Sequence, residues 1–167
     1  MDAAAGGLFD VADPALAALR DTLAVLHATA PRLVCRKSLG RSDVCPNQAR
    51  LLMLRTALVD KLTAEETERG RLDYGMQVAA FDRHGHRYDD MKLKYLYLSS
   101  VHYQLCGSGW NRFVRDNQLQ EARAAVKGTR QAIRVEVWAF RSPELPQDGV
   151  VELHPDGALG LAVVIRN

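Results

Sequence analysis

KSLGRSDVCPNQARLLM, residues 37–53, places a polar and cationic segment between two short apolar runs, 33–35 on its left and 51–54 on its right. Short apolar runs bounded by turn-forming residues are typical of buried strands. If both runs are buried, the segment between them lies at the surface, where its charged and amide side chains can contact a ligand. The stretch therefore predicts a β domain that presents a polar loop.

Further apolar runs of strand length recur at short intervals along the rest of the chain. Turn signals separate them, with HGH at 84–86 and CGSG at 106–109. Together with the first two, the candidate strands lie at 33–35, 51–54, 76–81, 87–96, 102–106, 133–140 and 159–165. Short strands at this spacing predict an antiparallel barrel or sandwich.

Two helical segments interrupt these strands. Residues 62–70 carry Thr63 as a predicted N-cap and Glu66 three residues later, which is the pattern of a capping box. Residues 109–119 repeat apolar side chains at helical spacing, beginning at Trp110. We expect short helices at the ends of the barrel. Both tryptophans of the chain stand among aliphatic residues, so we expect them in the core.

Residues 13–31 carry the signals of an amphipathic helix. Asp13 is placed as the N-cap and Pro14 as the first helical residue. Leucines then recur every three to four residues and form one apolar face: Leu16, Leu19, Leu23 and Leu26. We expect residues 1–31 to form a helical appendage and 32–167 to form the β domain. The apolar face can pack on the chain's own barrel, on a protein partner or on a second copy of the chain.

The formal net charge of +2 conceals an uneven distribution of charge. Residues 32–55 carry six cations and one acid, and 92–141 carry nine cations and three acids, which gives +5 and +6. Residues 1–31, 56–91 and 142–167 each sum to −3. If folding brings the two basic segments together, their combined field attracts a polyanion. The alternative is that they form two separate solvated faces.

Composition bounds the class of protein. A chain of 167 residues with 47% apolar residues suits one domain with a core and a short appendage. Its apolar stretches are shorter than a membrane span, and its first residues lack the basic start of a secretory signal. Three cysteines without a CxxC pair argue against a disulfide framework. We expect a soluble intracellular protein with reduced thiols and no membrane partner.

Two clusters of chemically active residues are candidate sites. The first gathers possible metal ligands around the HGH turn: Asp82, His84, His86, Asp89 and Asp90. It is explained more simply as strand, glycine turn and strand, with Gly85 at positive φ. The second pairs Cys106 with His102, but no oxyanion pocket accompanies the thiol, and a turn cysteine is the commoner case. We expect no metal, no cofactor and no catalysis.

The order of these segments carries a family resemblance. SDV at 42–44 before a strand, GW at 109–110 before a helical FV..N.L, and a final W-x-FR at 138–141 resemble the plant B3 DNA-binding domain. The likeness is greatest to its divergent DUF313-type branch, and it covers residues 33–145. It implies a seven-stranded open DNA-binding pseudobarrel with two short helices. It also implies a nuclear regulator of transcription.

The resemblance further implies two arms that grip the major groove of double-stranded DNA. The first arm follows the first strand, and the second joins the fourth and fifth strands. Carried over by position, the DNA-binding residues are Arg36, Lys37, Ser38, Arg41, Ser42, Asn47, Gln48 and Arg50 in the first arm and Ser99, Ser100 and His102 in the second. Arginine, asparagine and glutamine can bind base edges with two hydrogen bonds, whereas lysine and serine can hold phosphates.

The chain departs from the family pattern in two places. Val101 stands where many members carry an arginine, and 120–131 replaces a short acidic turn with a basic helix or loop. These departures leave an alternative open. In it, the domain has lost specific DNA binding and serves as a protein-interaction module that associates through its N-terminal helix.

Overall fold

The computed structural model describes residues 13–47, 50–97, 101–146 and 154–166, except for the side chains of Tyr97 and Val101. Each of the predicted strands is present. Their bounds are β1 Arg32–Ser38, β2 Leu51–Leu54, β3 Met76–Phe81, β4 Arg87–Tyr97, β5 Val101–Cys106, β6 Arg134–Ser142 and β7 Ala158–Arg166. The helices are η1 Pro14–Leu16, α2 Ala17–Val25, α3 Arg41–Val44, α4 Arg55–Leu58, α5 Ala64–Gly70, α6 Ser108–Asp116 and α7 Leu119–Val126.

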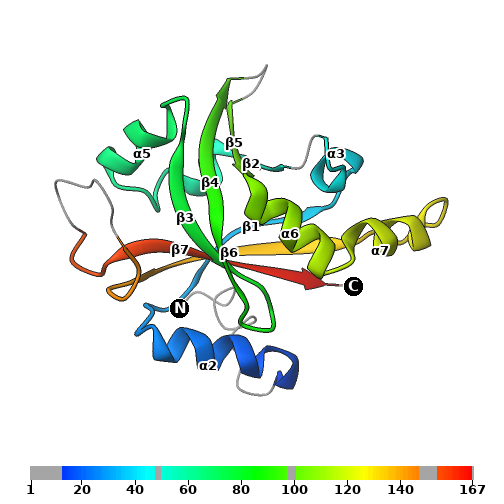
Figure 1. Cartoon of the computed structure of the whole chain (residues 1–167), viewed down its shortest axis with the longest axis horizontal. Coiled ribbons are helices and arrows are strands. Elements are labelled where there is room, and N and C mark those ends of the chain that lie inside the picture. Colours follow the sequence, from blue (N-terminus) through cyan, green and yellow to red (C-terminus); the bar gives the residue numbers. More distant parts are fainter. Residues whose placement is uncertain (1–12, 48–49, 98–100, 147–153, 167) are drawn as a thin grey trace.

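The strands form one seven-stranded sheet in the order β1-β6-β7-β3-β4-β5-β2. Every pairing is antiparallel except the short parallel contact of β3 with β7. The sheet curves around a common interior, and the helices lie outside it (Figure 1). Because β1 and β2 stand at the two ends of the strand order and do not pair, the barrel is open. The predicted pseudobarrel is confirmed.

The predicted helices are also present. Thr63 accepts the Glu66 N–H, and the Glu66 carboxylate accepts the Thr63 N–H, so the expected capping box begins α5. The segment expected at 109–119 forms α6, and the insertion after it contains the helix α7. Two further single-turn helices, α3 and α4, flank β2 and were not predicted. Four residues provide too little periodicity to separate one helical turn from a loop.

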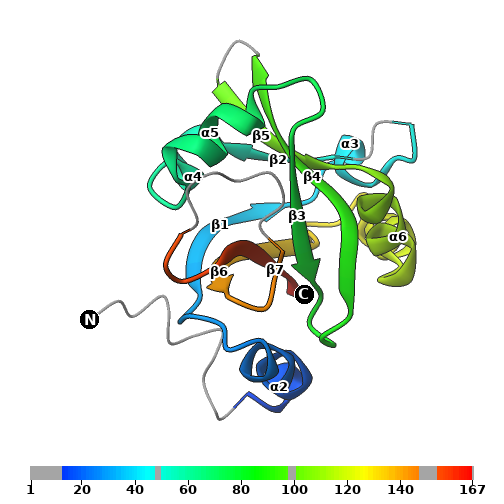
Figure 2. The same cartoon turned by 60° about the vertical axis from the view of Figure 1, so that its left-hand side comes forward.

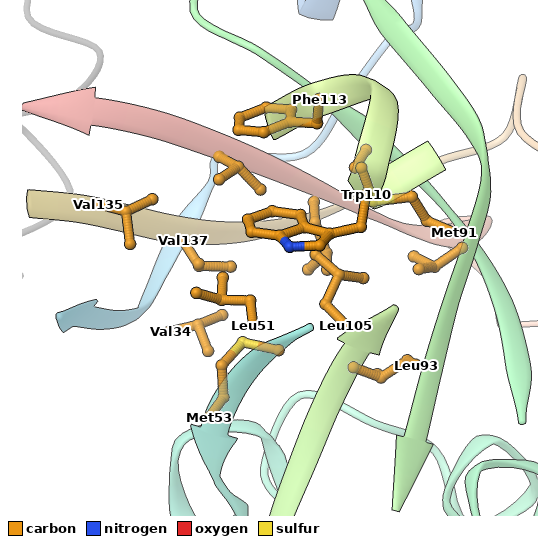
Figure 3. Packing of buried hydrophobic residues seen from close by; sticks show 14 of the residues in the cluster. Val34, Leu51, Met53, Met91, Leu93, Leu105, Trp110, Phe113, Val135 and Val137 are labelled. Carbon is orange, nitrogen blue, oxygen red and sulfur yellow. The ribbon is translucent and has the colours of Figure 1, made fainter. Parts of the chain in front are cut away.

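The interior of the barrel is filled by one apolar cluster. Trp110 of α6 projects into it between Met91, Leu105 and Val137 (Figure 3). Its side chain is fully buried and stacks on the ring of Phe113, with ring centroids 5.1 Å apart. The prediction that Trp110 is a core residue is confirmed.

A second apolar cluster covers the outer face of β6 and β7. Trp138 is fully buried there, beneath the three leucines Leu16, Leu19 and Leu23 of η1 and α2. Figure 2 shows α2 lying outside the barrel against these strands. Strands covered on both faces read as continuous apolar runs rather than alternating ones. This explains the sequence of β7, in which every residue from 158 to 164 is buried.

The N-terminal helix begins as predicted. The Asp13 carboxylate accepts the N–H of Ala15, and Pro14 is the first helical residue. The leucine face then packs on the chain's own barrel, which is one of the three destinations predicted for it. The division of the chain at residue 31 stays a prediction. Within the described residues, no helix has the length and apolarity needed to cross a membrane.

The turn between β3 and β4 approaches α2 closely. Gly85 has φ 80°, and a Cβ atom built there would lie 2.3 Å from Thr22 Oγ1 and 3.0 Å from the Ala18 carbonyl oxygen. Gly128 has nearly the same φ, 79°, but nothing lies within 4 Å of its would-be Cβ. A side chain at either position would therefore adopt the same unfavourable left-handed backbone conformation. Only at Gly85 would it also collide with neighbouring atoms.

This pair allows a matched test of the contact between helix and turn. Gly128→Ala is expected to cost about 1–2 kcal/mol of unfolding free energy, from the left-handed backbone alone. Gly85→Ala is expected to cost at least about 1 kcal/mol more, because the new methyl group collides with α2. Urea denaturation of both variants measures the difference. Equal losses of unfolding free energy in the two variants would show that α2 does not contact this turn closely.

Candidate nucleic-acid interface

The predicted first arm comprises the last residues of β1 and the segment between β1 and β2, and Asp43 holds it at its base. This buried carboxylate accepts the Gly40 N–H at 2.7 Å and the Lys37 ammonium at 3.1 Å. The same ammonium donates to the Leu52 carbonyl oxygen on β2 at 3.2 Å. Lys37 therefore bridges β1 and β2, the two edge strands of the open sheet, which do not pair with each other.

The arm is also anchored to the core. The indole N–H of Trp110 donates to the Asp43 carbonyl oxygen at 2.7 Å, and the neighbouring Val44 side chain is buried. Two motifs far apart in the sequence, SDV at 42–44 and GW at 109–110, thus meet at one hydrogen bond. A buried hydrogen bond of this kind orients both partners, because leaving either group unpaired costs about 1–3 kcal/mol.

Beyond this anchor, the arm presents polar side chains. Arg41, Ser42 and Asn47 line one shallow depression together with Cys45. Arg41 and Asn47 are exposed, and Ser42 is half-buried. An arginine and an asparagine that line the same depression can donate and accept at base edges. The structure therefore brings three of the predicted site residues together.

The other predicted residues of the first arm lie apart from this depression. Arg36 pairs with Glu136 at 2.8 Å, on the face of β6 that also carries Trp138. Burial acts to raise the pKa of Glu136, but hydrogen bonds from Arg36 and Arg166 outweigh it and leave the pKa below its usual value. Ser38 is exposed at the end of β1. Arg36 and Ser38 therefore lie on β1, at the start of the first arm.

Arg50 leads into β2 and is half-buried, and its Nε atom has no hydrogen-bond partner among the described residues. Gln48 lies outside the described residues. In the second arm, Ser99 and Ser100 also lie outside them. His102 is half-buried on β5. The roles of all these residues stay predictions.

Between the two arms lies the outer face of β4, β5 and β2. On β4, Met91 and Leu93 point into the core, while Lys92 and Lys94 alternate with them and point outward. Lys94 stands directly across from Gln104 of β5. We call Lys92, Lys94 and Gln104 the strand face.

Cys106 lies at the edge of the strand face, directly across from Lys92. Burial raises the pKa of its thiol, against the opposing charges of Lys94, Lys92 and Arg50. The raised pKa makes a nucleophilic thiolate unfavourable, which agrees with the prediction that Cys106 is not catalytic.

The strand face was not among the predicted site residues. Its signal in the sequence is the alternation MKLKYL at 91–96, in which cations take every second position of a strand. This alternation shows which side chains of the strand point away from the core. It does not show which strand pairs with it, so Gln104 could not be assigned to the same face.

The histidine segment is a glycine turn between β3 and β4, as predicted, and Asp82 caps it. The buried Asp82 carboxylate accepts the N–H groups of His84 at 2.8 Å and of His86 at 3.0 Å. Gly85 takes the expected positive φ. Within the described residues, no three His, Cys, Asp or Glu side chains gather in a way that could hold a metal ion.

Comparison with known proteins relates the chain to one family. Residues 12–152 match the family described as B3 domain-containing protein At2g31720-like. The B3 domain-containing protein At2g31720 of Arabidopsis thaliana is 30% identical over 150 residues, which cover 84% of this chain and 44% of the relative. The chain therefore spans less than half the length of that relative.

Two solved structures are similar at low identity. The Arabidopsis FUS3–DNA complex is 18% identical with a TM-score of 0.47, and the match covers 81% of this chain and 98% of that one. The complex of the Arabidopsis thaliana transcription factor LEC2 with DNA is 20% identical with a TM-score of 0.42, covering 67% and 84%.

Proposed function

The chain belongs to the plant B3 domain family of At2g31720-like proteins, and from this premise we propose that it binds double-stranded DNA in the nucleus and regulates transcription. Family membership points to a protein that is not an enzyme. The observation that carries the proposal is the first arm. Its polar depression stands on a base held by the Asp43 carboxylate and the Trp110 indole, so a ligand meets side chains that are already positioned.

The described contacts favour different roles for the cations of this arm. Arg41 and Asn47 are exposed and line the depression, so they suit contacts to base edges in the major groove. The Lys37 side chain is only 27% exposed and is engaged by Asp43. To reach a phosphate, the Lys37 ammonium would have to break its hydrogen bonds to Asp43 and to the Leu52 carbonyl oxygen. We therefore assign Lys37 to positioning the arm.

Base contacts by the arm lead to a direct test. Arg41→Ala or Asn47→Ala is expected to weaken binding to a selected duplex by about 1–3 kcal/mol and to relax the preference at one base pair. The reason is that a phosphate contact carries no sequence information, whereas a contact to a base edge does. Fluorescence anisotropy with selected and scrambled duplexes measures both effects. Arg83→Ala, in the turn beside α2, is the control.

Two outcomes contradict this assignment. If Arg41→Ala weakens selected and scrambled duplexes equally, the arginine holds a phosphate and does not read a base. If the unmodified chain binds no duplex even at low salt, the DNA-binding proposal is wrong.

The alternative of a protein-interaction module depended on the leucine face of the N-terminal helix. Leu16, Leu19 and Leu23 are at most 5% exposed, because they pack on β6 and β7. A partner could reach them only by displacing the helix from the barrel. Within the described residues, no observation favours this alternative over DNA binding.

A further inference from the structure

The strand face carries two cations, Lys92 and Lys94, that have no acidic partner among the described residues. Among the described residues, no carboxylate oxygen lies within 4.0 Å of the Lys92 or Lys94 ammonium. The acids nearest in sequence are already paired, Asp89 with Arg87 and Asp90 with Arg112. No described carboxylate therefore neutralises the positive charge of the strand face.

Cations elsewhere on the barrel are often paired. Arg36 and Arg166 share Glu136, and Arg141 pairs with Glu66. Lys92 and Lys94 thus differ from cations that stabilise the fold. Two lysines on one strand that have no carboxylate partner in the described part of the chain create a local positive potential that is available to a ligand.

The position of this face relates it to both arms. The strands β4 and β5 lead to and from the second arm, and β2 follows the first. In Figure 1, β5 and β2 lie between the upper end of β4 and the helix α3 of the first arm. A rod-shaped ligand held by both arms would therefore pass over the outer face of these strands.

We infer that the strand face is a third contact surface for DNA, in which Lys92 and Lys94 bind backbone phosphates of the duplex held by the two arms. This inference rests on the proposed DNA binding. The two lysines are two residues apart on one strand, or about 6.7 Å along it, which lets them reach different phosphates. Gln104, directly across from Lys94, can donate a further hydrogen bond from its amide. Phosphate contacts set register and affinity without reading sequence.

The test measures how affinity depends on salt. Each lost phosphate contact reduces the slope of log affinity against log salt by about 0.9 and lowers affinity at 0.1 M salt on the order of fivefold to tenfold. Lys94→Gln is therefore expected to reduce the slope by about one unit, and Lys92→Gln with Lys94→Gln by about two. Selected and scrambled duplexes should lose affinity by the same factor.

Two variants serve as matched controls. Arg83→Gln removes one charge in the β3–β4 turn beside α2, so it should leave the slope unchanged. Lys94→Arg keeps the charge and should keep the slope. The unfolding temperature of each lysine variant is expected to match that of the parent. The reason is that neither lysine ammonium forms an ion pair with a carboxylate among the described residues.

The outcomes separate this inference from the proposed function. If the parent binds duplex DNA and the double variant keeps the parent's slope, the third contact surface is wrong and DNA binding by the arms stands. If Arg83→Gln lowers the slope as much as Lys94→Gln, the effect is one of net charge and the inference is wrong. If the parent binds no duplex at low salt, both proposals are wrong.

Discussion

Replacement of Trp138 by alanine is expected to lower the free energy of unfolding by about 3–5 kcal/mol. The indole is fully buried between β6 and the leucines of the N-terminal helix, so its removal leaves a cavity on that face of the sheet. The loss combines the transfer free energy of the ring with the cost of a cavity that the rigid strands cannot close. Urea denaturation followed by circular dichroism measures it.

Leu54→Ala provides the control for this prediction. Leu54 is 56% exposed on β2, and its truncation is expected to change stability by only about 0.5 kcal/mol. A Trp138→Ala variant that unfolds at the parent's denaturant midpoint would show that the helix does not cover β6.

Glu66→Gln is expected to destabilise the protein by about 3–5 kcal/mol, because it breaks a buried ion pair and leaves the Arg141 guanidinium uncompensated. The two side chains are 8% and 9% exposed, and Arg141 Nη1 donates to Glu66 Oε2 at 3.0 Å. Arg141 also donates to the carbonyl oxygens of Lys61 and Gly157, at 3.1 Å each. The pair therefore joins β6 to the loops before α5 and β7.

The same pair predicts a dependence on pH. Burial acts to raise the pKa of Glu66, but hydrogen bonds from Arg141 and the Thr63 N–H outweigh it, so the pKa in the folded state is lowered. A group with a lowered folded-state pKa contributes stability above its unfolded-state pKa of about 4.3 and loses it as the pH falls through the folded-state value. The difference in stability between parent and Glu66→Gln should therefore narrow below about pH 4.

Glu68→Gln is the matched control on the same helix. Glu68 is 72% exposed and pairs with Arg71 at 3.5 Å, so its loss is expected to cost less than about 1 kcal/mol. Chemical denaturation of both variants at neutral and acid pH checks the prediction. Equal losses at neutral pH would show that water reaches the Glu66–Arg141 pair.

Local signals in the sequence located the strands and the longer helices of this protein, but not the single-turn helices α3 and α4. The apolar runs located the strands because a buried strand has to fill its inner face with apolar side chains. Asp13 and Pro14 located the start of the N-terminal helix, and Thr63 with Glu66 located that of α5, because capping satisfies backbone groups within three residues. The interior position of Trp110 also followed from local apolar spacing.

The composition of the first arm was likewise readable from the sequence, but the separate duties of its residues were not. Arg36 and Lys37 look alike as neighbouring cations in a polar segment. In the fold, one pairs with Glu136, a hundred residues away, and the other bridges β1 and β2 through Asp43 and Leu52. Nothing near either cation in the sequence distinguishes a positioning lysine from one that contacts a ligand.

Only the tertiary structure decided which distant segments meet. It pairs β3 with β7 in parallel, buries Arg141 against Glu66, and sets Lys94 across from Gln104 between the two arms. Apolar periodicity and helix capping depend on a few adjacent residues, whereas strand partners and ion pairs depend on how the whole chain closes its loops. Side chains that no local pattern connects therefore acquire their partners only when the barrel forms.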